Sequence, residues 1–193
     1  MIINSDTTLN GASGTMKNTL LSKLNISKAL LLASVYHANQ RRKYDGSPYI
    51  NHLIEVMSLL IVVGNVTSIN MICAAILHDI LEDTDLAPEV LEQELNAEVL
   101  WFVKNLTGKK DSSIEQRRRA VIDKLTGNKD ELKCIKLADI CSNVAKIPKD
   151  WTDERVICYV DWLDEVSLLC KDANMSLYEE YLSRKEASLT ARF

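Results

Sequence analysis

The chain has 193 residues, of which 47% are hydrophobic, and a formal net charge of −4. A chain of this length can bury one substantial core, and its negative charge disfavours general nucleic-acid binding, which needs a continuous basic surface. No stretch approaches the ~18 apolar residues of a membrane span, and the N-terminus has no charged region followed by an apolar signal core. We therefore expect a cytoplasmic protein without a membrane partner.

The first 20 residues are rich in Ser, Thr, Asn and Gly, and we expect them to form a flexible leader before a folded domain over residues 21–193. Apolar residues then recur at three- and four-residue spacing, which predicts an all-α fold. Glycine and proline residues fall between the predicted helices, and no alternating apolar-polar run is long enough for a sheet. The predicted helices cover residues 24–38, 52–63, 69–81, 87–95, 97–106, 114–125, 132–144, 154–170 and 177–189.

The helix predicted over residues 69–81 ends in the most informative stretch of the chain, His78-Asp79-Ile80-Leu81-Glu82-Asp83, which has four ionisable side chains. At about 100° per residue, a continuous helix places His78, Asp79, Glu82 and Asp83 within an arc of roughly 140°. Adjacent carboxylates are costly to bury unless a cation compensates their charge. The cluster therefore indicates either a divalent-metal site or the solvated acidic face of a surface helix.

The remaining candidate ligands favour the metal site. The chain has three histidines, and His52 opens an apolar run, while Asp139 and Asn143 are spaced i,i+4 on one helix face. Two imidazoles and two carboxylates suit a mononuclear transition metal that keeps open positions for water and substrate. Donor chemistry alone permits manganese, iron or zinc.

The five cysteines are odd in number and show no Cys-x-x-Cys spacing. They predict buried thiols in a reducing compartment. Cys141 lies between Asp139 and Asn143 in sequence, and we interpret it as a core residue.

Four motifs, in order along the chain, resemble the HD-type hydrolase domain of RelA/SpoT homologues, and more narrowly the small stand-alone alarmone hydrolases. The resemblance covers residues 24–182 and implies a single-domain, all-α metallohydrolase fold. The motifs are Arg41-Arg42-Lys43, Ser47-Pro48-Tyr49-Ile50-Asn51-His52, Leu77-His78-Asp79-Ile80-Leu81-Glu82-Asp83-Thr84 and Lys136-Leu137-Ala138-Asp139.

The resemblance also implies a role for each matching residue. The metal, usually Mn²⁺ in this family, would be held by four side chains: His52, His78, Asp79 and Asp139. Glu82 and Asp83 correspond to the pair that activates and orients the attacking water. The residues that match substrate-binding positions are Arg42, Lys43, Asn143, Arg155 and Tyr159. His37 matches a family histidine outside the metal set, and we expect it to be structural or to line the pocket.

The sequence departs from the family pattern at three places. Leu53 stands where a proline commonly follows the histidine. Ile140-Cys141-Ser142 replaces a basic residue, a leucine and an aromatic residue or histidine. Ile114 aligns with a lysine that metazoan members use for phosphate, so Lys109, Lys110 or Arg117 are the alternatives for that role.

These features leave three hypotheses. The favoured one is an Mn²⁺-dependent guanosine-3′,5′-bis(diphosphate) 3′-pyrophosphohydrolase that degrades the alarmone of the stringent response, (p)ppGpp, to GDP or GTP and pyrophosphate. The second is a related HD-type phosphatase on another nucleotide, such as NADPH. The third is an idle module that only binds the alarmone, which the retained Glu82 and Asp83 argue against. The oligomeric state stays open.

Overall fold

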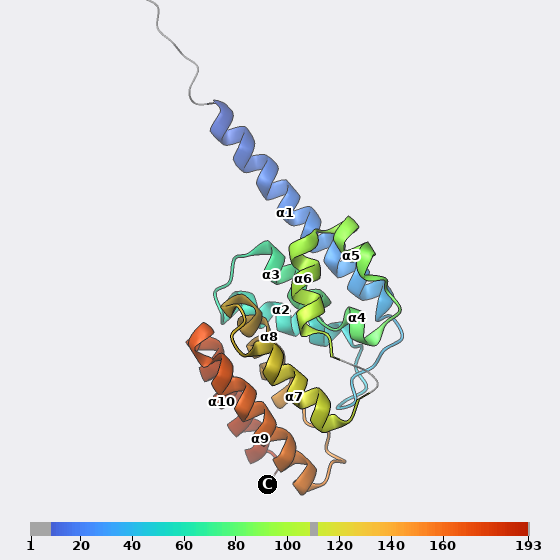
Figure 1. Ribbon diagram of the computed structural model, residues 1–193, viewed down its shortest axis with the longest axis vertical. Coiled ribbons are helices and arrows are strands. Elements are labelled where there is room, and N and C mark those ends of the chain that lie inside the picture. The colour runs from blue at the N-terminus through green and yellow to red at the C-terminus, as the bar shows by residue number, and fades with distance from the viewer. Residues whose placement is uncertain (1–8, 109–111, 193) are drawn as a thin grey trace, which may run out of the picture.

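The computed structural model describes residues 9–108 and 112–192, with side chains from residue 22 onward. Within these residues the fold is helical, and the β-structure there is a single bridge between Arg41 and Pro48 (Figure 1). The all-α prediction is therefore confirmed. In addition, no described helix combines the length and the apolar character needed to cross a membrane.

Most helices lie within two residues of their predicted bounds. Several begin at a side-chain cap: Ser68, Asn96, Ser113, Thr152 and Asn174 each accept a hydrogen bond from a backbone N–H of the first turn. The observed bounds are α1 Leu9–Tyr36, α2 Ile50–Val62, α3 Ile69–Leu77, α4 Ile80–Asp83, α5 Pro88–Glu94, α6 Ala97–Leu106, α7 Ile114–Leu125, α8 Asp130–Val144, α9 Asp153–Cys170, the 3₁₀ turn η1 Lys171–Ala173 and α10 Met175–Thr190.

Helix α1 is longer than predicted. It begins at Leu9, so residues 9–20 of the predicted leader are helical, while residues 1–8 lie outside the described residues. The C-terminal part of α1 is fixed by packing against α3, where Ala29 and Ala33 are fully buried. Extending a helix from such a nucleus costs little per residue, which explains why the polar segment joins it. Figure 1 shows the N-terminal part of α1 projecting beyond the other helices.

The continuous helix predicted over residues 69–81 is wrong at one point. Helix α3 ends at Leu77, His78 and Asp79 form a turn, and α4 follows. The His78 ring explains the break, because its Nδ1 lies 2.8 Å from the Ala75 carbonyl oxygen, which a continuing helix would bond to the Asp79 N–H. Asp79 therefore takes φ −98° and ψ −4°, and the four ionisable residues do not share one helical arc.

Helices α3 and α8 lie at the centre of the fold. Helix α8 packs against α2, α3, α9 and α10, and α3 packs against α1, α2 and α6 (Figure 1). Both helices are buried along most of their length, and α3 is apolar on nearly every side. Their buried residues include Met71, Ile72, Cys73, Ala74, Ala75, Ile76, Leu77, Leu132, Ile135, Leu137, Ala138, Ile140, Cys141 and Val144. The end of α3 and the middle of α8 are thus rigid supports for the polar residues that they carry.

All five cysteines are free thiols, and four of them are buried as predicted. Cys141 is fully buried, as expected for a core residue, and burial raises the pKa of its thiol to about 12. Cys158 is exposed, so the prediction is wrong for this residue. The core side of α9 is formed by Val156, Val160 and Leu163, and Cys158 lies on another side of the helix.

Candidate metal centre and substrate cleft

The predicted metal ligands come from two helices and from the turn between α3 and α4, and they meet inside the protein. His52 on α2, His78 after α3 and Asp139 on α8 are buried, and each offers a ligand atom within 4.8 Å of the other two. Asp79 is less buried, and its Oδ2 lies 2.9 Å from His78 Nε2 and 3.7 Å from His52 Nε2. Asp139 Oδ1 lies 3.6 Å and 3.4 Å from the same two nitrogens. The structure therefore brings together all four side chains of the predicted set.

Hydrogen bonds on the far side of each ring direct the two Nε2 atoms inward. His78 Nδ1 contacts the Ala75 carbonyl oxygen, which can only accept, so Nδ1 carries a proton and Nε2 is the nitrogen that faces the cluster. His78 Nε2 is buried and makes no hydrogen bond among the described residues. A buried imidazole nitrogen beside two carboxylates can hold a divalent cation in place of a proton, so these residues fit a metal.

The charges around the cluster also fit a cation. Burial opposes ionisation of both carboxyls, but His78 holds the pKa of Asp79 below its usual value, and Lys136 does the same for Asp139. Lys136 Nζ lies 2.7 Å from Asp139 Oδ2. The Tyr49 hydroxyl donates to Asp79 Oδ2 at 2.6 Å, and burial together with Asp79 raises the pKa of Tyr49. Both acids are thus carboxylates that already accept hydrogen bonds, Asp79 through Oδ2 and Asp139 through Oδ2 from Lys136.

In each of the two predicted catalytic carboxylates, one oxygen accepts a hydrogen bond that holds the side chain in place. Glu82 Oε2 accepts from the backbone N–H of Gly108 at 2.6 Å, and Asp83 Oδ2 accepts from Gln40 Nε2 at 2.7 Å. Gln40 Oε1 in turn lies 2.5 Å from Nδ1 of the buried His37. His37 therefore has a structural position, as predicted, since it orients the amide that holds Asp83.

Two of the predicted substrate-binding residues form a chain that leads to the metal ligands. Asn143 Nδ2 donates to Asp139 Oδ1 at 2.6 Å, and Arg42 Nη1 donates to Asn143 Oδ1 at 3.3 Å. Arg42 is buried, whereas Lys43 is exposed, and both line one cavity of about 370 Å³. The structure thus separates the pair, with one cation linked to the metal cluster and one at the edge of a cavity.

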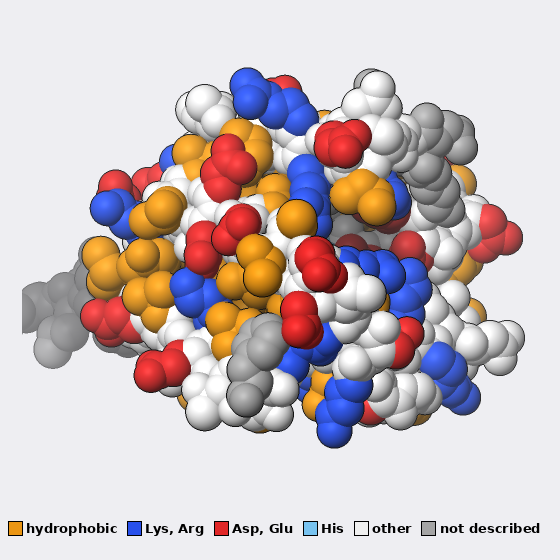
Figure 2. Space-filling model, turned by 90° about the horizontal axis from the view of Figure 1, so that it is seen from below, with side chains coloured by type: hydrophobic (Ala, Val, Ile, Leu, Met, Phe, Trp, Pro, Cys, Tyr) orange, Lys and Arg blue, Asp and Glu red, His pale blue; other side chains and the backbone are white. Residues whose placement is uncertain are grey.

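A larger cavity of about 530 Å³ is lined by three of the four predicted metal ligands and by an aromatic wall. It is lined by His78, Asp79, Glu82, Lys136 and Asp139, and by both remaining predicted residues, Arg155 and Tyr159. The two cavities share Tyr49, Glu82, Arg117, Asn143, Trp151 and Tyr159, so they form one cleft. Figure 2 shows a hollow on one face with Lys and Arg side chains at its edge and acidic side chains inside.

The aromatic wall combines flat rings with a stacked guanidinium group. The Trp151 ring lies edge-on to Tyr159, at a centroid distance of 5.3 Å, and the Arg155 guanidinium lies 3.9 Å from the Trp151 centroid. Trp162 lies beyond Tyr159, and Arg118 lies 5.4 Å above its ring. This wall can stack a planar base and offer positive charge to a phosphate.

The structure also shows where Ile114 lies, the residue that aligns with a phosphate-binding lysine of the family. Ile114 is exposed at the cleft, and Arg117, one helical turn later, lines both cavities. The geometry therefore favours Arg117 among the predicted alternatives, while Lys109 and Lys110 lie outside the described residues.

The sequence interpretation missed several residues that contact the site, and four of them illustrate why. Tyr49 and Lys136 lie inside the quoted motifs, so their spacing could have indicated them. Gln40 and Trp151 carry no comparable signal, because the turn after α1 and the loop before α9 bring them to the site only in the folded chain.

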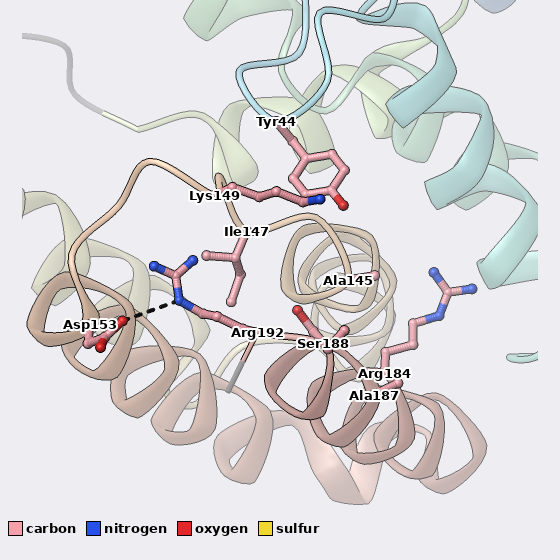
Figure 3. Close-up of a pocket in the computed structure, with 10 residues that line it drawn as sticks. Tyr44, Ala145, Ile147, Lys149, Asp153, Arg184, Ala187, Ser188 and Arg192 are labelled. Atoms are coloured by element: carbon pink, nitrogen blue, oxygen red, sulfur yellow. Dashed lines mark ion pairs between the residues drawn. The ribbon is translucent and has the colours of Figure 1, made fainter.

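A third cavity, of about 510 Å³, lies between the loop after α8 and the end of α10, and none of the predicted metal ligands lines it. Figure 3 shows Arg192 directed toward Asp153, while Arg184 extends away from these two residues. Arg192 donates to the carbonyl oxygens of Pro148 and Trp151, and Arg184 pairs with Glu55 and Glu180. These two arginines are thus already bonded within the protein.

Comparison with known proteins gives consistent matches. The HD domain family matches residues 29–146. The guanosine-3′,5′-bis(diphosphate) 3′-pyrophosphohydrolase MESH1 of Danio rerio is 34% identical over 164 residues, which are 80% of this chain and 91% of the relative. The Homo sapiens protein of the same name is 33% identical over 148 residues, 74% of this chain and 83% of the relative. A solved structure of a metazoan orthologue of SpoT that hydrolyses ppGpp superposes with a TM-score of 0.79 at 30% identity, covering 84% of this chain and 94% of the other.

Proposed function

The chain belongs to the HD domain family, and on that basis we propose that it is a metal-dependent hydrolase that converts guanosine 3′,5′-bis(diphosphate) to GDP and pyrophosphate. The pentaphosphate relative would give GTP. The observation that supports this most directly is the buried, unbonded His78 Nε2 beside two carboxylates, at the end of a nucleotide-sized cleft. We assign residues 21–193 as the catalytic domain and the cytoplasm as its compartment.

The metal-holding residues in this proposal are His52, His78, Asp79 and Asp139, and the proposed ion is Mn²⁺. Such an ion, when bound, lowers the pKa of water and neutralises charge on phosphoryl oxygens. The protein contributes the arrangement of donors, with both Nε2 atoms facing two carboxylates whose pKa values lie below the usual range.

Glu82 and Asp83 would have different roles toward the attacking water. Glu82 lines the cavity that also contains His78, Asp79 and Asp139, so it is placed to accept the proton of the water. Asp83 lines only the adjoining cavity and would orient the same water. Each acid has one oxygen fixed, by Gly108 or by Gln40, which leaves the other oxygen for the reaction.

The cleft would bind the substrate by stacking and by charge. The guanine would lie against the Trp151 and Tyr159 rings, while Arg117, Arg155 and Lys136 would face the phosphates. The oxygen of the water forms a bond to the phosphorus attached to the ribose 3′-oxygen, and the bond between that phosphorus and the 3′-oxygen breaks. The 3′-oxygen gains a proton, and pyrophosphate leaves.

The test is to incubate the Mn²⁺-loaded protein with guanosine tetraphosphate, NADPH and ordinary nucleoside phosphates, and to identify the products by chromatography. We expect GDP and pyrophosphate from the tetraphosphate. Release of orthophosphate from NADPH, with the tetraphosphate intact, would instead support the phosphatase alternative. Binding of the tetraphosphate without any product would support the idle module.

The matched variants are Glu82→Gln and Asp83→Asn, which keep the size of each side chain but remove its charge. We expect Glu82→Gln to lower kcat by roughly 10²- to 10⁴-fold, the usual contribution of a general base. Full turnover by Glu82→Gln with retained metal would remove Glu82 from this role.

A further inference from the structure

A buried serine connects the metal ligand His52 to a charged group on the other side of the ring. Ser142 is fully buried on α8, and its Oγ lies 2.9 Å from His52 Nδ1 and 3.0 Å from Glu55 Oε2. Position 142 is one of the places where the sequence departs from the pattern that it resembles. The short hydroxyl side chain thus bridges α8 and α2 behind the metal cluster.

The Glu55 carboxylate fixes the direction of both hydrogen bonds. Lys146 Nζ lies 3.0 Å from Glu55 Oε2, and Arg184 Nη1 lies 2.7 Å from Oε1. Figure 3 shows Arg184 pointing away from α10 toward a neighbouring helix. A carboxylate between two cations only accepts, so the Ser142 hydroxyl donates to it. Ser142 Oγ then accepts from His52 Nδ1–H, and His52 Nε2 keeps its lone pair.

A competing interaction makes this arrangement necessary. Asp139 Oδ1 lies 3.4 Å from His52 Nε2, and Asp79 Oδ2 lies 3.7 Å from the same atom. Both carboxylates favour a proton on Nε2, which would block that nitrogen as a metal ligand. A strong acceptor on the Nδ1 side is therefore needed to keep the proton away from the metal-binding nitrogen.

We propose that Ser142 and Glu55 are positioning residues that hold the His52 proton on Nδ1 and thereby set the affinity of the site for a divalent metal. This inference rests on the metal centre proposed above. Arg184 and Lys146 take part by keeping Glu55 charged and in place, so the C-terminal helix α10 is connected to a metal ligand through three successive contacts.

The first measurement is the dissociation constant of Mn²⁺ alone, determined by competition with a chelator. Removing such an outer partner usually costs 10–100-fold in metal affinity, and we expect a loss in that range for Ser142→Ala. Ser142→Thr keeps the hydroxyl and should bind Mn²⁺ within about threefold of wild type, while Glu55→Gln should weaken binding severalfold. Wild-type affinity in both Ser142→Ala and Glu55→Gln would overturn the proposal.

Two control variants distinguish an error in the metal centre from an error in the positioning role. Ser167→Ala removes another buried serine hydroxyl, which donates to the Asp164 carbonyl oxygen away from the metal cluster, and should leave Mn²⁺ affinity unchanged. Asp139→Ala should abolish Mn²⁺ binding. If Asp139→Ala binds as wild type does, the metal centre itself is wrong. If only Ser142→Ala and Glu55→Gln bind normally, the metal centre stands and the positioning role is wrong.

A second measurement reports directly which nitrogen of His52 carries the proton. In the ¹⁵N spectrum of the metal-free protein at pH 8, we expect His52 to be protonated at Nδ1 in the wild type and at Nε2 in Ser142→Ala. The same tautomer in both proteins would overturn the proposal even if metal affinity changed, because a general loosening of the fold could weaken binding.

Discussion

Replacing Gly108 with alanine is expected to impair catalysis while leaving the fold nearly intact. A Cβ atom at Gly108 would lie 2.9 Å from Glu82 Oε2 and 3.3 Å from Glu82 Cδ. Ordinary van der Waals contact begins near 3.4 Å, so the carboxylate must move by about 0.5 Å. The atoms that would clash are the end of a flexible side chain, which can rotate away without displacing the helices.

The size of the effect follows from that shift. A misplacement of 1 Å in a catalytic group costs about 10²-fold in rate, so a shift of half this size is expected to lower kcat roughly 10-fold, or about 1.4 kcal/mol. Stability should change by less than about 1 kcal/mol, because the lost contact is offset by the smaller backbone entropy of alanine in the unfolded chain. Steady-state kinetics and urea unfolding measure the two quantities.

The decisive control is a double-mutant cycle. If Gly108 acts through Glu82, then Gly108→Ala added to Glu82→Ala should cause little further loss of kcat, because the side chain that it displaces is gone. An equal loss in both backgrounds would refute this reasoning and would place the effect of Gly108 elsewhere in the cleft.

Four further predictions concern metal, substrate and stability. Asp79→Ala should lose its divalent metal on desalting, since Asp79 Oδ2 faces both imidazoles, and elemental analysis showing full retention would exclude it as a ligand. In steady-state assays, Arg155→Ala should raise KM roughly 10-fold and leave kcat unchanged, because it removes the cation stacked on Trp151. An equal fall in kcat would contradict this prediction. Tyr181→Phe should lower the free energy of unfolding by about 1–2 kcal/mol in urea, because the buried hydroxyl donates to a carboxylate, and an unchanged midpoint would disagree. The free energy of unfolding of the wild type should exceed that of Glu55→Gln at pH 7, and the difference should shrink as the pH falls below about 4. The reason is that Glu55 has a lower pKa in the folded state than in the unfolded chain. A difference that does not change with pH would count against the ion pairs of Glu55.

Helix positions were predictable where local signals act. The helices Ala97–Leu106 and Ile114–Leu125 have the predicted bounds, because each combines an apolar period with an Asn or Ser cap. The break after Leu77 was not predictable from periodicity, since it arises from one side chain that takes the carbonyl of Ala75. The early start of α1 was missed for a similar reason, because packing of its later turns overrides a weakly helical segment.

The sequence predicted which residues form the candidate site better than it predicted the contacts that they make. The sequence indicated His52, His78, Asp79 and Asp139 through donor chemistry and family resemblance, and the structure brings their side chains together. Their roles, and those of the substrate-binding residues, stay predictions. Contacts such as Gln40 to Asp83 depend on which turns meet in the folded chain, and neither spacing nor composition encodes that information.

The site is built from two helices and the turn that follows a third, and this origin determines which changes of chain length it can tolerate. One residue inserted into Ile69–Leu77 or Asp130–Val144 would rotate the ligand that follows it by about 100°, and the cluster would come apart. One residue inserted into the connection at 84–87 or 126–129 would leave each helix in register. Among homologues of this fold, insertions and deletions should therefore gather in the connections and be absent between the start of each of these helices and the metal ligand in it or directly after it.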